Sequence, residues 1–342
     1  MNVGEWFGIE TPRVLRAIET ELRSTNNLIG KPPEVHNPVG LEIEIENTEK
    51  YASAILRLHE SSMTNPLLSI FSIVEDRSLR NNGIEIVSLP IDETSVKPYL
   101  VLVFNYLKSK YLKCKFSDRC GIHIHQDVTT ATFEQVVNII KMYIIFEDKI
   151  FQYAGEGRKN NTFCTAYSKF DIRKKVLTDY IIRNMNPGEY LPEEDFGKYA
   201  GLNICRLQNI GTLEYRHLPG LWNIDHITNF VKIIGCLKRY VIRDLVNPTE
   251  DLNKIIGQLN TISNYREFIY TVFGDFMYYL FPEEDYKSIE EGVTLSKLCI
   301  LPEVIHKKLG IQSIINNKAF YKLLKNKLVQ NDEIPNDQGG RW

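Results

Sequence analysis

The stretch Gly40-Leu41-Glu42-Ile43-Glu44-Ile45-Glu46 alternates strictly between carboxylates and apolar side chains. Successive side chains of an extended strand point to opposite faces, so the glutamates would share one face and the aliphatic residues the other. Glutamates two positions apart lie roughly 7 Å from each other on such a face, and they repel unless a cation lies between them. An edge strand with a solvated acidic face would show the same alternation, and the other strands decide between the two interpretations.

The composition is that of an ordinary globular protein. The chain has 342 residues, of which 43% are hydrophobic and 25% charged, and its net charge is −2. This length accommodates two modest domains or one large sheet with inserted helices. The charge provides no basic field, so nucleic acid is not expected as an obligatory partner. No apolar run reaches the length of a membrane span, so no membrane association is expected.

The first residues and the cysteines indicate the compartment. Residues 1–6 carry neither the basic nor the apolar region of a signal peptide. The six cysteines are scattered and form no Cys-x-x-Cys pair. In a chain of this size, that pattern favours free, mostly packed thiols in a reducing cytoplasm over a disulfide framework or a zinc site. We therefore expect a cytoplasmic protein.

Helical and strand patterns divide the chain into four parts. Residues 1–35 contain an amphipathic helix that begins at Thr11-Pro12 and reaches about Leu22. Residues 36–245 form the main domain, residues 246–328 show helical apolar faces, and the polar tail 329–342 is expected to be flexible. Within the main domain we expect helices over 48–58, from a cap at Asp92 or Thr94 to 110, over 132–153, and from Asn223 onward.

Two short β-rich runs surround Arg80-Asn81-Asn82-Gly83 and predict a strand, a turn and a second strand. Asp76 ends the first run, and Glu85 lies within the second. A generic hairpin with a charged rim explains this segment equally well when it is considered alone.

Two later strands also carry polar residues on one face. Alternation in Cys120–Asp127 places His123 and His125 on the same face of one strand. Alternation in 211–217 likewise places Glu214 and Arg216 on the same face of another strand. Histidines at positions i and i+2 of a strand can bind a metal or a phosphate. Paired surface histidines and an exposed ion pair are the purely structural alternatives.

Two loops are candidates for contacts with ligands. Residues 154–161 contain two glycines and the cations Arg158 and Lys159, which could wrap a phosphate. A helix C-cap followed by a solvated turn explains the same composition. The charged stretch 171–195 is long for a loop in a compact domain, so we expect a surface excursion that acts as a mobile flap.

Four strand-like regions thus present acidic or imidazole side chains on one face. Hard carboxylate oxygens favour Mg²⁺ or Mn²⁺ over zinc, and the interposed Arg and Lys residues suit polyphosphate recognition. The sequence contains neither a Walker-type loop nor the loop set of protein kinases. A nucleotide would therefore be held by an antiparallel sheet rather than by a P-loop.

At these residues the chain resembles the amidoligase family, the carboxylate–amine ligases of the glutamine synthetase and glutamate–cysteine ligase superfamily. The resemblance covers roughly residues 39–220 and implies an α+β fold, in which a curved antiparallel β-sheet has helices packed on one face and a helical C-terminal region follows. It further implies that ATP and two or three divalent cations, Mg²⁺ or Mn²⁺, bind the concave face. Its motifs, in the family's order, are Gly40-Leu-Glu42-Ile-Glu44, Asp76-Arg-Ser-Leu with Gly83-Ile-Glu85-Ile-Val-Ser88, Cys120-Gly-Ile-His123-Ile-His125 and Thr212-Leu-Glu214-Tyr-Arg216.

The resemblance implies two groups of metal ligands. One ion would be held by Glu44, Glu85 and Asp76, and the ion that bridges the nucleotide phosphates by Glu42, His123 and Glu214. Glu75 is an alternative to Asp76, because the spacing from this position to Glu85 varies in such enzymes. Glu46 continues the acidic face but lies beyond the core motif.

The remaining site residues would contact phosphates or take part in catalysis. The resemblance places Arg216 at the transferred phosphoryl group, with Glu214 as its catalytic neighbour, and His125 at the nucleotide. Arg206 is a candidate clamp for a phosphate or for the carboxylate of a substrate. The loop at 154–161 adds Arg158 and Lys159 as phosphate ligands.

The implied reaction is ATP-dependent amide formation. A carboxylate attacks the γ-phosphorus of ATP to give an acyl phosphate and ADP, and an amine then displaces the phosphate. Amino acids, a peptide or protein tail, a cell-wall precursor or the amine of a modified nucleobase all fit as substrates, and the sequence fixes neither these nor the oligomeric state. A metal-dependent phosphoesterase or nuclease and a non-catalytic nucleotide- or metal-binding protein are the alternatives.

Overall fold

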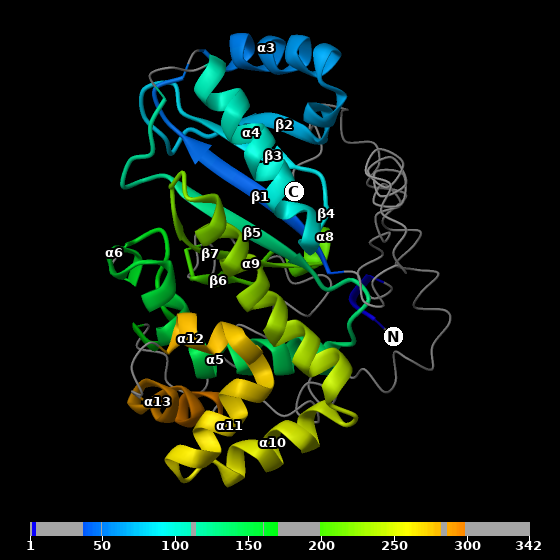
Figure 1. Cartoon of the computed structure of the whole chain (residues 1–342), viewed down its shortest axis with the longest axis vertical. Helices are drawn as coiled ribbons and strands as arrows, with labels where there is room; N and C mark the ends of the chain where they lie inside the picture. Colours follow the sequence, from blue (N-terminus) through cyan, green and yellow to red (C-terminus); the bar gives the residue numbers. More distant parts are fainter. Residues whose placement is uncertain are drawn as a thin grey trace.

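The computed structural model describes residues 2–4, 37–48, 50–110, 114–159, 161–169, 199–281 and 286–297. These residues form an α+β fold around an open, seven-stranded antiparallel sheet (Figure 1). The helix predicted for residues 11–22, the predicted flap at 171–195 and the predicted tail at 329–342 lie outside the described ranges.

The strand order does not follow the order of the chain. Six strands form the path β2-β3-β1-β5-β7-β6, and β4 pairs with the beginning of β1. Every pairing between these strands is antiparallel. The strands are β1 (Pro38–Ile45), β2 (Phe71–Glu75), β3 (Ile84–Ser88), β4 (Ile91–Asp92), β5 (Gly121–Asp127), β6 (Leu202–Asn203) and β7 (Thr212–Pro219).

The acidic strand β1 lies in the centre of the sheet, between β3 and β5. Its aliphatic residues are fully buried on one face, as the alternation predicts. Its glutamates are buried as well: Glu42, Glu44 and Glu46 are only 4%, 6% and 2% exposed. The edge-strand interpretation is therefore wrong, since an edge strand would leave these carboxylates in water.

The main helices confirm most of the helical predictions. Thr132 and Gln135 form the predicted capping box at the start of α5, and Asn223 caps α9 through the backbone N–H of His226. The long helices are α3 (Tyr51–Thr64), α4 (Val96–Lys110), α5 (Phe133–Ala154), α9 (Ile224–Arg239), α10 (Pro248–Gln258), α11 (Ile262–Phe273) and α13 (Lys287–Ser296), and the short ones are α6 (Glu156–Lys159), α8 (Leu207–Ile210) and α12 (Met277–Leu280).

Three local predictions need correction. The helix predicted over 48–58 spans 51–64 instead, because Asn47 adopts a positive φ of 57° and the chain turns there before the helix begins. The loop at 154–161 contains the single helical turn α6. The segment Gln208-Asn209-Ile210-Gly211 predicts a simple turn, but residues 207–210 form the helical turn α8, which ends at Gly211 in the left-handed conformation.

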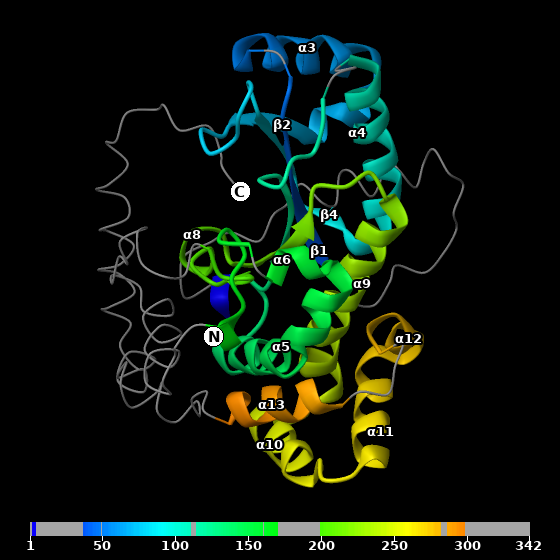
Figure 2. The same cartoon turned by 90° about the vertical axis from the view of Figure 1, so that its left-hand side faces the viewer.

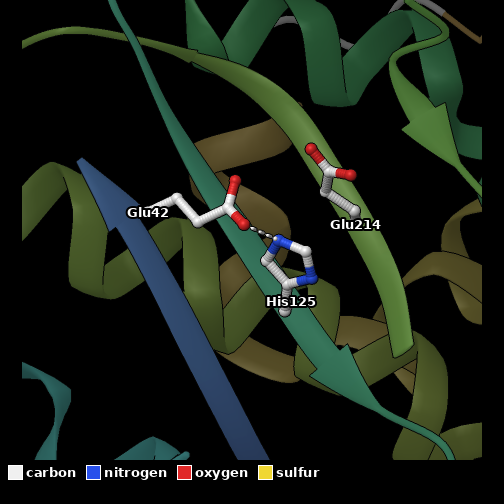
Figure 3. Close-up of side chains that lie close together, drawn as sticks. All are labelled: Glu42, His125 and Glu214. Atoms are coloured by element: carbon white, nitrogen blue, oxygen red, sulfur yellow. Dashed lines mark ion pairs between the residues drawn. The ribbon is translucent and has the colours of Figure 1, made fainter. Parts of the chain in front are cut away.

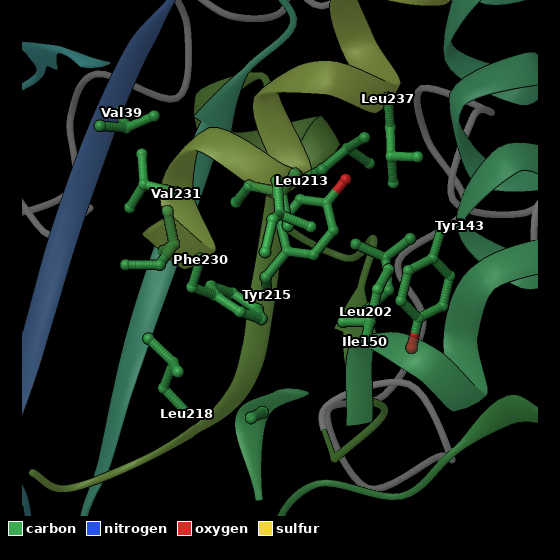
Figure 4. Close-up of a cluster of buried hydrophobic side chains, with 14 of the residues drawn as sticks. Val39, Tyr143, Ile150, Leu202, Leu213, Tyr215, Leu218, Phe230, Val231 and Leu237 are labelled. Atoms are coloured by element: carbon green, nitrogen blue, oxygen red, sulfur yellow. The ribbon is translucent and has the colours of Figure 1, made fainter. Parts of the chain in front are cut away.

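The hydrophobic core lies on the face of the sheet opposite the glutamates. Helices α4 and α9 lie on one side of the sheet and α8 lies on the other (Figure 2). Apolar residues of β7, such as Leu213 and Tyr215, meet Phe230 and Val231 of α9 and Tyr143 of α5 in one buried cluster (Figure 4). The described helices α4 and α9 therefore pack on the apolar face and not on the acidic one (Figure 2).

The C-terminal helices share this core. Residues of α11 and α13 belong to the same buried cluster as the sheet, and α13 approaches α5 so closely that a Cβ at Gly292 would lie 2.4 Å from the carbonyl oxygen of Ile145. The predicted domain boundary at 245/246 stays a prediction. The five described cysteines are free thiols, and no described helix combines the length and apolarity needed to cross a bilayer.

We predict that Ile43→Ala destabilises the protein by about 2–5 kcal/mol, because Ile43 is fully buried and its truncation leaves a cavity beneath the acidic strand. Urea unfolding of the wild type and the variant measures this difference. Ile262→Ala is the matched control, since Ile262 is 64% exposed at the start of α11. Similar unfolding midpoints for the two variants would contradict the assignment of Ile43 to the core.

Candidate functional site

The strand register places the polar side chains of the site in rows across the sheet. Paired residues in neighbouring antiparallel strands point to the same face. The pairs therefore bring together side chains that lie as many as 89 positions apart in the chain, as for His125 and Glu214. They are Glu85 with Glu44, Glu42 with His123, His125 with Glu214, and Glu214 with Asn203.

A β-bulge in β7 aims one arginine at this face. Ile122 pairs with Leu218 and Ile124 pairs with Tyr215, so β7 contains one more residue than β5 between these pairs. Arg216 lines the pocket above the acidic face, whereas the next residue, His217, is fully buried among core aromatic rings. Bulges commonly redirect side chains next to active sites, and this one separates a site residue from a core residue.

Three side chains form the most compact group of potential metal ligands (Figure 3). One ligand atom from each of Glu42, His125 and Glu214 lies within 4.8 Å of the others, and all three residues are buried. The Nε2 atom of His125 lies 2.9 Å from Oε1 of Glu42 but makes no hydrogen bond to any described residue. The Nδ1 atom lies 3.1 Å from the Thr212 hydroxyl, which orients the ring.

His123 lies at the centre of three carboxylates. Its Nδ1 atom is 3.2 Å from Glu42 and 3.5 Å from Glu214, and its Nε2 atom is 3.8 Å from Glu44. His123 also lines the pocket, whereas His125 is fully buried. The structure thus brings together the predicted ligands Glu42, His123 and Glu214, and it adds His125, which we had expected at the nucleotide.

The electrostatics of Glu42 and Glu214 differ from those of the neighbouring acids. Burial acts to raise the pKa of Glu42, but His125 and His123 outweigh it and hold that pKa well below its ordinary value. Burial acts in the same direction on Glu214, and Arg216 and His125 outweigh it, so its pKa is also lowered. Both groups therefore carry a negative charge that imidazole and guanidinium groups partly balance.

Glu44 and Glu85 lack such compensation. Burial raises the pKa of Glu44 despite His123, Arg216 and the backbone N–H of Gly121, which donates a hydrogen bond of 2.6 Å to it. Burial raises the pKa of Glu85 further, because the charges of Glu42, Glu44 and Asp76 add to the effect. This part of the site is therefore short of positive charge.

The geometry favours Asp76 over Glu75 as the third acid of this group. Val74 pairs with Glu85 and shares its face, and both Glu75 and Asp76, at and just after the end of β2, line the pocket. The charge of Asp76 acts on both Glu44 and Glu85, whereas Glu75 pairs with Arg77 at 3.5 Å in solvent. Asp76 also accepts a hydrogen bond from the backbone N–H of Ser78.

Guanidinium groups form the other side of the site. Arg216 Nη1 lies 2.5 Å from Glu214 Oε1, and Arg206 Nε lies 3.4 Å from Glu214 Oε2. Both arginines line the pocket, and Asn203 donates a further hydrogen bond of 2.7 Å to Glu214. Burial acts to lower the pKa of Arg216, but Glu214 and Glu44 outweigh it and raise that pKa. Arg216 is therefore held in place as a permanent cation.

The two cations of the 154–161 segment have different surroundings. Arg158 lines the pocket, and it also donates hydrogen bonds to the backbone carbonyls of Arg216 and His217 at 2.8 and 3.2 Å. It thereby fixes the bulge that presents Arg216. Lys159 pairs with Asp148 of α5, outside the described wall of the pocket.

An open pocket of about 1000 Å³, including its mouth, is lined both by acids of the site with His123 (the acidic wall) and by arginines (the basic wall). Several of its residues were missed by sequence reasoning: Ser78, Arg119, Phe163 and Tyr199 line it, and Asn203 holds Glu214. Arg119 directly precedes a predicted strand and could have been found. Phe163 and Tyr199 lie in irregular segments and gave no periodic signal. Glu46 has a structural role, since it accepts a hydrogen bond from the backbone of Arg80.

Comparison with known proteins identifies one family. A family model described as "Putative amidoligase enzyme" matches residues 46–234, more than half of the chain. The matched span contains the predicted site residues from Asp76 to Arg216, whereas Glu42 and Glu44 directly precede it. No curated protein gives a significant match to the sequence. The chain therefore belongs to the amidoligase family.

Proposed function

We propose that this protein is an ATP- and Mg²⁺-dependent ligase that joins a carboxylate to an amine through an acyl phosphate. Membership of the amidoligase family supports the ligase class. The observation that carries the proposal is a single pocket that is lined by carboxylates, an imidazole and guanidinium groups. Carboxylates suit a hard divalent cation, and guanidinium groups suit phosphate oxygens. The open antiparallel sheet also agrees with a glutamine synthetase-like fold, which is part of this proposal.

The acidic wall fits divalent cations for two reasons. The buried Nε2 atom of His125 lies 2.9 Å from Glu42 Oε1, and ligand atoms of Glu42, His125 and Glu214 all lie within 4.8 Å of one another, so that one metal ion could contact all three. The raised pKa of Glu85 shows that its charge is poorly compensated. Glu42 and Glu214 with one of the two histidines would hold one ion, and Glu44, Glu85 and Asp76 the other. Bound Mg²⁺ or Mn²⁺ would neutralise phosphate charge.

The basic wall has a defined task in the first of the two steps. In the first step, an oxygen of the substrate carboxylate bonds to the γ-phosphorus as the bond to the leaving ADP breaks. Arg216 and Arg206 would stabilise the charge on the transferred phosphoryl group. In the second step, the amine nitrogen bonds to the acyl carbon, phosphate leaves, and the nitrogen gives up a proton. Glu214 holds both guanidinium groups, which makes it a positioning residue.

The proposal is tested by an ADP-release assay with Mg²⁺, ATP and pooled amino acids or peptides, and by mass spectrometry of the products. We expect ADP formation that depends on an added carboxylate, and an amide product only when an amine is present. A metal-dependent phosphoesterase would instead cleave phosphate esters without any need for ATP or an amine. A rate of ADP formation that does not change when the carboxylate and the amine are added would argue against a ligase.

Glu85→Gln should stabilise the metal-free protein at pH 8 by on the order of 1–2 kcal/mol. Burial and neighbouring acids raise the pKa of Glu85 in the folded state, so the folded protein binds this proton more tightly than the unfolded chain. The stability of the wild type without metal must then fall as the pH rises through and above the ordinary carboxyl range. Glutamine cannot ionise, so the variant should lose part of this pH dependence. Urea unfolding in EDTA at several pH values measures both effects.

The same variant reports on metal binding. Mg²⁺ should stabilise the wild type, since a ligand that binds only the folded state shifts unfolding by mass action, and it should stabilise Glu85→Gln less. Glu60→Gln, an exposed change on α3, is the control. An equal gain from Mg²⁺ in wild type and Glu85→Gln would remove Glu85 from the metal site.

Arg216→Lys should reduce ADP formation by roughly 10²-fold, the scale seen when one preorganised donor is lost. Lysine keeps the charge but cannot fork onto a phosphoryl group. Because the interaction forms mainly in the transition state, nucleotide affinity should stay within a few-fold of the wild type. Arg243→Lys, an exposed arginine that pairs with Asp244, is the matched control. An unchanged rate would leave Arg216 with a structural role only.

A further inference from the structure

One stretch of the pocket wall is aromatic, although most of the wall is charged. Phe163 and Tyr199 line the pocket together, with ring centroids 5.6 Å apart in an edge-to-face arrangement. The side chain of Tyr199 is 43% exposed. Neither ring is used by the proposed metal and phosphate chemistry, and apolar surface that faces water is unfavourable at about 25 cal/mol per Å².

The two rings are held in place by the backbone around them. Residues 163–168 and 199–201 lie side by side, because the Thr165 N–H donates to the Tyr199 carbonyl at 2.6 Å and the Gly201 N–H donates to the Thr165 carbonyl at 2.8 Å. The Phe163 carbonyl also accepts a hydrogen bond from Arg216 Nε at 3.4 Å. The aromatic pair is thus fixed relative to the catalytic wall.

A buried carboxylate anchors this segment from the core side. Glu147 of α5 accepts hydrogen bonds from the backbone N–H groups of Tyr167 and Ser168 at 2.7 and 3.1 Å, and from the Tyr143 hydroxyl at 2.8 Å. Such contacts order the segment before any ligand binds. A preordered surface loses less entropy on binding than a flexible one.

Arg119 links the aromatic pair to the turn that carries Asp76. Its guanidinium lies over the Phe163 ring at 5.9 Å, and its Nη1 atom donates to the Ser78 carbonyl at 2.7 Å. Arg119 and Ser78 line the same pocket as the two rings. Two aromatic rings and a guanidinium are therefore close together in the lining, and each of these groups interacts favourably with a planar π system.

We propose that Phe163 and Tyr199 form a subsite for a planar aromatic ring carried by one of the substrates. Three groups could supply the ring: the base of the nucleotide, an aromatic group of the carboxylate substrate, or an aromatic group of the amine substrate. Each of them presents the same kind of flat surface. This inference rests on the proposed function in one respect, because the ligase reaction defines which substrates could carry the ring. The binding of the ring itself does not require turnover.

The test is calorimetric titration of the full chain, in Mg²⁺ and without turnover, with four probes. Adenosine, 3-phenylpropanoate and 2-phenylethylamine each present an aromatic ring from one of the three sources. The fourth probe, 3-cyclohexylpropanoate, has similar bulk but no π face. We expect at least one ring probe to bind, and 3-cyclohexylpropanoate to bind several-fold more weakly than 3-phenylpropanoate if the acid carries the ring.

Variants link this binding to the two residues. Phe163→Leu and Tyr199→Leu should each lower the affinity for the ring probe by about 5- to 10-fold, which is the scale of one aromatic contact. Tyr199→Phe keeps the ring and should retain most of the affinity. Tyr278→Leu, a change at a 67% exposed tyrosine of α12, is the matched control. Circular dichroism of each variant checks that the fold is intact.

The outcomes separate this inference from the proposed function. Ring binding that depends on Phe163 and Tyr199 supports the subsite, whether or not amide formation is found, and the probe that binds identifies the source. Failure of all three ring probes to bind, or equal affinities in wild type, Phe163→Leu and Tyr199→Leu, overturns the subsite. Amide formation in the same preparation would then leave the ligase proposal standing.

Discussion

Repulsion between buried carboxylates is the constraint on which the rest of this structure depends. Glu42, Glu44, Glu85 and Glu214 lie on one face of the sheet, on strands β1, β3 and β7, in surroundings where burial penalises every ionised acid. The protein compensates this charge unevenly: imidazole and guanidinium groups balance Glu42 and Glu214, whereas Glu44 and Glu85 stay short of positive charge. A divalent cation, as proposed above, is a group that would complete the balance.

The opposite face of the same strands supplies the stability that this arrangement requires. Leu41, Ile43 and Ile45 are fully buried, and the apolar sides of α4, α5 and α9 cover them and their neighbours. Because side chains alternate along a strand, every residue that adds charge to one face is followed by one that adds apolar contact to the other. Large buried area on one face can therefore offset electrostatic cost on the other without any change of backbone.

The sequence was most informative where a single periodicity decides the outcome. Alternation located the acidic face of β1 and the histidines of β5, and a capping pattern located the start of α5, because each depends on residues close in the chain. It could not give the strand order, which places β1 between β3 and β5, since that order depends on contacts between distant segments. The bulge at Arg216 was also inaccessible, because an extra residue in β7 is defined only by its pairing with β5. Phe163 and Tyr199 reach the pocket through irregular backbone, which has no period to detect.

The bulge in β7 also explains how the charged site and the core can be adjacent without disturbing each other. Arg216 faces the acids, and the next residue, His217, contacts the Tyr143 hydroxyl through Nε2 at 2.9 Å. Burial and the nearby Arg158 lower the pKa of His217 to about 3, so this imidazole stays neutral at any physiological pH. The Tyr143 hydroxyl donates to Glu147, which anchors the segment that carries Phe163. A change of charge among the acids would therefore act on Arg216 directly, while the network behind the strand keeps its protonation state and holds the pocket wall in position.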